Sequence, residues 1–168
     1  MTLALKRLAI NALIAAIYVN LTLVTASFAY RDIQFRIAEI LILLVFFRKD
    51  YLFGVAIGCF LANLFGPLGL IDAVFGTLAT IASGLLIAYS KRLFVATLFP
   101  VLINGLVVGA ELHFLEGLPF WLTAASVAIG EFVVVSIIGY LAMRKLRHND
   151  FFMEMIGANQ NYTPSVVK

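Results

Sequence analysis

The sequence predicts an all-α, polytopic membrane protein, and three observations lead to that prediction. Hydrophobic residues make up 63% of the 168-residue chain, and charged residues make up 12%, against about 25% in soluble globular domains. Mean hydropathy is +1.05. Uncharged apolar runs recur that are close to the roughly 20 residues a spanning helix needs. This composition excludes a disordered protein, a nucleic-acid-binding protein and an ordinary cytosolic enzyme.

The first expected helix covers residues 6–26. Lys6 and Arg7 precede an uncharged run from Leu8 to Tyr30. Because this run is far longer than the apolar core of a signal peptide, about 7–15 residues, we expect a spanning helix rather than a cleaved leader.

The second expected helix covers residues 34–48 and is short. The stretch from Gln34 to Phe47 would rise only about 21 Å as an α-helix, less than the roughly 30 Å of a hydrocarbon core. The preceding loop, residues 27–33, must then dip inward. Irregular backbone at that depth is tolerated where it lines a cavity.

Four further helices are expected at 51–66, 70–90, 93–113 and 118–144. The apolar runs beneath them show no polar–apolar alternation, so a membrane β-barrel is not indicated. We expect these six helices to form one transmembrane domain, residues 1–148. Residues 149–168 are expected to be a loosely ordered cytoplasmic tail, or a segment lying on the membrane surface.

Lysine and arginine set the expected orientation, because cytoplasmic loops carry an excess of them. With the N-terminus inside, only Arg31 and Arg36 of the 12 basic residues fall on the outer side. We therefore expect a multi-pass membrane protein with both termini cytoplasmic.

Polar residues are expected mainly in the outer half of the bundle. Counting helical rise from the inner charges places Glu39, Asn104, Asn63 and Glu131 about 14–20 Å up, above an aliphatic inner half. Charges at such depth are costly and face a wet cavity or one another. A polar bowl open to the outside over an apolar floor suits capture of an extracellular solute, and not a pore.

Motifs for catalysis, metal binding and nucleotide binding are missing from the sequence. Cys59 is the only cysteine, and His113 and His148 lie far apart. There is no phosphate-binding loop, no HExxH and no GxSxG. We therefore expect no enzyme, no metal and no cofactor.

Four segments together resemble the QueT family over roughly residues 8–146. They are Gln34–Glu39 (QFRIAE), Gly58–Asn63 (GCFLAN), Gly69–Thr80 (GLIDAVFGTLAT) and Val127–Glu131 (VAIGE). The resemblance implies a six-helix S component of an energy-coupling-factor (ECF) transporter that takes up queuosine precursors, which are 7-deazaguanines such as preQ1, preQ0 or queuine. Implied partners are the lipid bilayer, a transmembrane coupling subunit and two ATPase subunits, and no nucleic acid.

S components contact the coupling subunit through small residues on the first helix, and Ala12, Ala15 and Ala16 match that pattern. Small residues let helices approach closely in lipid. Gly54/Gly58 and Gly105/Gly109 have the same spacing, and we expect them to serve internal packing.

A deazaguanine ligand suggests roles for the outer polar residues. A carboxylate accepts from the N1–H and exocyclic amine of the base, which we expect of Glu39 and Glu131. Candidate donors are Gln34, Arg36, Asn63 and Asn104. Asp72 or Glu111 is expected to hold the cationic aminomethyl group.

Structural readings of these residues stay open alongside the functional ones. Arg36 and Glu39 form an ion pair in one reading, Asn63 and Asn104 bond between helices, and Asp72 stabilises a helix N-terminus. An S component for another vitamin or nucleobase-like solute, or a membrane scaffold without transport function, is the alternative for the whole chain.

Overall fold

The computed structural model describes residues 3–29 and 34–162, and this part of the chain is helical without any strand. In chain order the elements are α1 (Leu3–Val24), α2 (Ala26–Ala29), the 3-10 helix η1 (Ile37–Phe46), α3 (Tyr51–Leu64), α4 (Leu70–Tyr89), α5 (Leu93–Glu116), α6 (Phe120–Glu131), the π-helix η2 (Phe132–Gly139), α7 (Tyr140–Leu146) and α8 (Asp150–Met155). The all-α prediction is confirmed. The expected last helix, 118–144, corresponds to α6, η2 and α7 in direct succession.

Four helices are long and apolar enough to cross a membrane: Ala4–Val24, Leu70–Tyr89, Leu93–Glu116 and Phe120–Leu146. The other two apolar helices, η1 and α3, are shorter. Six complete spans and the sidedness of the termini remain predictions.

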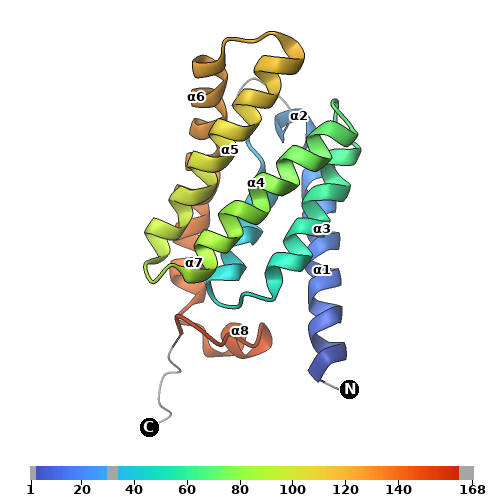
Figure 1. Cartoon of the computed structure of the whole chain (residues 1–168). Helices are drawn as coiled ribbons and strands as arrows, with labels where there is room; N and C mark the ends of the chain where they lie inside the picture. Colours follow the sequence, from blue (N-terminus) through green and yellow to red (C-terminus); the bar gives the residue numbers. More distant parts are fainter. Residues whose placement is uncertain (1–2, 30–33, 163–168) are drawn as a thin grey trace.

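The long helices surround η1. Neighbouring helices pack in chain order, α3 on α1, α4 on α3, α5 on α4 and α6 on α5, while η1 touches α1, α3, α4, α5 and η2 (Figure 1). The core therefore centres on η1, whose Ile42, Leu43 and Val45 are fully buried.

The winding of η1 differs from the α-helix expected at 34–48. A 3-10 helix rises about 2.0 Å per residue against 1.5 Å in an α-helix, so ten residues extend about 20 Å. Tighter winding lets a short apolar segment reach farther through the bundle than the same residues in an α-helix.

Glycines allow α1 to approach α3 and α6 to approach α5. A Cβ at Gly58 would lie 2.7 Å from Cβ of Tyr18, and one at Gly109 would lie 2.7 Å from Cα of Ala124. Gly54 and Gly105 face Asn11 and Ala128 in the same way. The expectation that both glycine pairs serve internal packing is confirmed.

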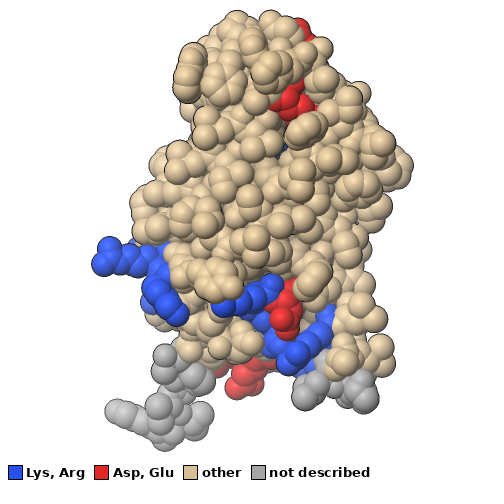
Figure 2. Space-filling view, viewed as in Figure 1, with Lys and Arg blue, Asp and Glu red and all other residues tan. Residues whose placement is uncertain are grey.

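The two ends of the bundle differ in charge. Lys and Arg side chains gather at the end where α3 and α5 begin and α7 ends, called here the basic end (Figure 2). Asp72, Glu111 and Glu116 lie near the opposite end of α4 and α5, called here the acidic end.

The tail is ordered over residues 150–162, contrary to the expectation of a loose segment. Met153 of α8 is fully buried, Gln160 donates to the carbonyls of Val45 and Phe46, and Asn161 donates to the carbonyl of Phe46. The last carbonyls of a helix need donors from elsewhere, and at η1 the tail supplies them. Residues 163–168 lie outside the described part.

Candidate functional site

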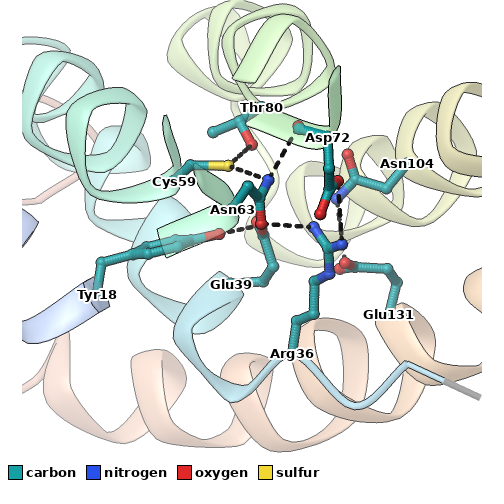
Figure 3. A network of polar contacts seen from close by, with 9 residues as sticks. All are labelled: Tyr18, Arg36, Glu39, Cys59, Asn63, Asp72, Thr80, Asn104 and Glu131. Atoms are coloured by element: carbon teal, nitrogen blue, oxygen red, sulfur yellow. Dashed lines mark hydrogen bonds and ion pairs between the residues drawn. The ribbon is translucent and has the colours of Figure 1, made fainter. Parts of the chain in front are cut away.

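A cluster of polar side chains is enclosed by α1, η1, α3, α4, α5 and α6 on the acidic side of the core (Figure 3). It contains all eight residues expected to bind substrate, and each is at most 6% exposed: Gln34, Arg36, Glu39, Asn63, Asp72, Asn104, Glu111 and Glu131. Residues from five helical segments far apart in sequence therefore converge at one place.

Arg36 links three segments at the entry to η1. Its Nη2 lies 3.5 Å from Oδ1 of Asp72 on α4, and its Nη1 donates to Oδ1 of Asn63 on α3 at 3.4 Å. Asn63 in turn donates to the backbone carbonyl of Asp72 at 3.3 Å. The ion pair expected as the structural reading of Arg36 exists, but its partner is Asp72 and not Glu39.

Two carboxylates are each held by one oxygen. Tyr18 of α1 donates to Oε1 of Glu39 at 2.5 Å, and Asn104 of α5 donates to Oε1 of Glu131 at 3.1 Å. A hydrogen bond to an ionised acceptor is stronger than a neutral one, so these donors fix the carboxylates firmly.

The approach of α6 to the start of η1 depends on Gly130. A Cβ at this position would collide with the backbone carbonyl of Gln34. Only a residue without a side chain permits this contact, which brings Glu131 and Gln34 to neighbouring positions in the cluster.

Several acceptor atoms in the cluster receive no hydrogen bond from any described residue. They are Oε1 of Gln34, Oε2 of Glu39, Oδ1 of Asn104, Oε2 of Glu131 and both carboxylate oxygens of Glu111. Buried polar atoms are nearly always hydrogen-bonded, because leaving one without a partner costs about 1–3 kcal/mol. The cluster is thus suited to a small molecule that carries several N–H donors.

A cavity of about 240 Å³ reaches the cluster from the acidic end. Gln34, Arg36, Asp72 and Glu111 line it, together with Glu116 at the end of α5 and with apolar side chains, among them Pro67, Leu68, Val108 and Leu122. The other four expected site residues, Glu39, Asn63, Asn104 and Glu131, do not line this cavity. The volume lies just below the roughly 300–1,000 Å³ of drug-sized sites, which fits a compact heterocycle.

Sequence reasoning missed Tyr18, Cys59 and Thr80. Tyr18 is 1% exposed and reaches Glu39, while Thr80 donates to Sγ of Cys59 at 3.3 Å. These residues lie inside uncharged apolar runs, where no charge or spacing marks them. A tyrosine hydroxyl buried in the middle of a spanning helix was the one available signal, since it requires a partner.

A second hollow, an apolar groove of about 940 Å³, lies between α1 and α3 and contains all three alanines expected to contact a coupling subunit. Ala12 and Ala16 are exposed in it, whereas Ala15 is 8% exposed and packs towards Gly58. The small side chains of the exposed pair leave the α1 backbone accessible to a helix that packs against it. Ala15 serves mainly the α1–α3 contact.

Comparison with known proteins agrees with this architecture. The family model described as QueT transporter matches residues 8–148. The chain is 33% identical over 152 residues to the queuosine precursor transporter QueT of Lactococcus lactis subsp. cremoris (strain MG1363), covering 80% of this chain and 88% of that protein. No solved structure matches the chain.

These similarities confirm the expected family and a transport protein rather than an enzyme. With 8–148 matched in one piece, the whole helical bundle that encloses the polar cluster is covered. The chain belongs to the QueT transporter family.

Proposed function

We propose that this chain captures a 7-deazaguanine queuosine precursor from outside the cell, as the S component of an ATP-driven ECF importer. The relative from Lactococcus is named as a queuosine precursor transporter, and four long apolar helices suit a membrane subunit. The observation that carries the proposal is the set of buried acceptor oxygens without donors among the described residues.

The free acceptors match the donors of a guanine-like edge. N1–H and the exocyclic amine are adjacent donors, and Glu39 and Glu131 each present a free Oε2 while their other oxygen is held. We assign these two carboxylates to the base edge, with the free oxygens of Gln34 and Asn104 as further acceptors. Arg36, Asp72 and Asn63 bond to one another, so we assign them to holding the frame of the site.

Binding assays test the substrate class. Purified protein is titrated by calorimetry and thermal shift with preQ1, preQ0, queuine, guanine, riboflavin and thiamine, since a ligand that binds the folded state raises the melting temperature. We expect a deazaguanine to bind selectively and Glu131→Gln or Glu39→Gln to weaken it. Glu154→Gln in α8 is the matched control.

Three other outcomes would revise the proposal differently. Deazaguanine binding that survives both substitutions would support the proposed substrate class and contradict the roles assigned to Glu39 and Glu131. Tight binding of riboflavin or thiamine would leave an S component with another substrate. A monodisperse sample that binds none of the six would favour a scaffold.

A transport assay tests the coupling part separately. The groove between α1 and α3 is apolar, with Ala12 and Ala16 exposed, which suits a helix of a coupling subunit. We expect Ala16→Leu to abolish ATP-dependent uptake in cells and to leave ligand affinity of the isolated protein unchanged. Leu13→Ala, at an exposed position of the same helix that does not line the groove, is the control, and equal loss of uptake in both variants would contradict this surface.

A further inference from the structure

Glu111 of α5 differs from the other carboxylates of the polar cluster. It is 6% exposed, it lines the cavity at the acidic end, and neither of its carboxylate oxygens receives a hydrogen bond from a described residue. Asp72 is paired with Arg36, Glu39 is held by Tyr18, and Glu131 is held by Asn104.

Among the described residues that line the cavity, the charges do not balance. Arg36 is the basic one of these residues, and it is already engaged by Asp72, whereas Glu111 and Glu116 are both acidic. A buried carboxylate without a partner is costly to keep ionised, and an incoming cation offsets that cost. The apolar walls, including Leu68 and Val108, strengthen such an attraction because they exclude water.

The position of Glu111 also separates it from the groups assigned to the base edge. Glu39 and Glu131 lie deeper and do not line the cavity, while Glu111 lines it together with Glu116, the last residue of α5. If the base edge of a ligand reaches the deep carboxylates from this cavity, its opposite end would lie on the side of Glu111.

We propose that Glu111 is the counter-ion for a protonated amine on the 7-substituent of the ligand, and so selects cationic over neutral deazaguanines. This inference rests on the proposed function. It makes Glu111 a specificity-determining residue and leaves Asp72 to its ion pair with Arg36.

The test compares two ligands that share the base and differ at the arm. PreQ1 carries a cationic aminomethyl group and preQ0 carries a neutral nitrile. We expect wild-type protein to bind preQ1 more tightly than preQ0. Glu111→Gln should lower the affinity for preQ1 by roughly 10- to 100-fold, the effect of one hydrogen bond to a charged group. The affinity for preQ0 should change by less than about threefold, because preQ0 has no charged group that loses its partner.

Two further variants keep the result interpretable. Glu111→Asp retains the charge and should restore part of the preQ1 preference, which a purely structural residue would not do. Glu154→Gln removes a carboxylate remote from the cavity and should leave the affinity for both ligands unchanged. The melting temperature without ligand shows whether each variant is folded.

The outcomes separate this inference from the proposed function. Equal affinity of wild type for both ligands, or equal losses for both in Glu111→Gln, would overturn the role of Glu111 and leave a deazaguanine transporter. Failure of wild type to bind preQ1, preQ0 or queuine would overturn the proposed function, and the role of Glu111 with it.

Discussion

Buried polar side chains lie at both ends of the helical bundle, and they are satisfied in different ways. At the basic end, Arg48 donates to the carbonyl of Gly157, Tyr51 donates to the carbonyl of Ile156, and Gln160 caps η1. None of these three leaves a buried atom without a partner among the described residues. At the acidic end, Glu111 leaves both carboxylate oxygens without one.

The difference separates polar groups that complete the fold from polar groups that we propose to bind a ligand. The basic-end side chains donate to backbone carbonyls that have no partner within their helices. These donors and acceptors are therefore satisfied within the protein. In the polar cluster, Glu39 and Glu131 each have one oxygen held and one open, and Glu111 has both open, which costs stability unless something else supplies donors. Substitutions at the basic end should therefore change stability alone, and those at the acidic end should change binding.

The largest expected effect comes from Arg36, which lines the cavity at the acidic end but is bonded within the fold. Replacing Arg36 with Gln leaves Asp72 buried without a counter-charge, and breaking a buried ion pair in this way costs about 3–5 kcal/mol. Unfolding in detergent with increasing denaturant measures the change. A loss below about 1 kcal/mol would mean that water or another group compensates Asp72.

Tyr18→Phe should have the next largest effect. It removes the donor to Glu39, and a hydrogen bond to a charged group contributes about 1.5–3 kcal/mol. A double-mutant cycle with Glu39→Gln measures the coupling between the two side chains. Additive effects would show that the pair contributes nothing beyond its separate packing.

Gln160→Ala and Asn161→Ala test the basic end. Each removes side-chain donors to the carbonyls at the end of η1, so we expect about 1–2 kcal/mol lower stability for each. Ligand affinity should stay at the wild-type value. Weaker binding with an unchanged melting temperature would contradict the separation between the two ends.

The smallest effect is expected at Tyr162. Its hydroxyl donates to Oδ1 of Asp150 at 2.5 Å, and this bond raises the pKa of Tyr162 to about 12. Since the pKa in the folded state lies above the unfolded value of about 10, the contribution is full below about pH 10 and is lost as the pH rises through about 12.

The melting temperature of Tyr162→Phe should therefore fall slightly below that of wild type near neutral pH and converge with it above about pH 12. Thermal unfolding at both pH values measures this. A constant difference across the pH range would assign the effect to packing of the ring instead.

Much of the fold was predictable because the preference of a segment for an apolar environment depends on its own residues. The starts of α3, α4 and α5 agree with the predicted segments 51–66, 70–90 and 93–113, since charges and turn residues bound their apolar runs. Burial of the eight residues in the polar cluster was also predictable one at a time, because a polar side chain inside such a run is costly wherever its helix packs.

Pairing between those residues was not predictable. Whether Arg36 meets Glu39 or Asp72 depends on how η1 is wound and rotated relative to α4, which the sequence pattern of either segment does not contain. The tail shows the same limit. Its polar residues predicted disorder, and they are ordered because η1 ends with open carbonyls beside them.

The order of amino acids specifies a helical, apolar chain and marks the polar residues that its apolar runs would bury. Packing of the helices against one another sets the pairs: Tyr18 donates to Glu39, Asp72 pairs with Arg36, and Glu111 is left without a partner among the described residues. The cause of this division is distance. Burial follows from the composition of a segment, whereas a hydrogen bond or ion pair requires two atoms from different segments to meet within about 3.5 Å.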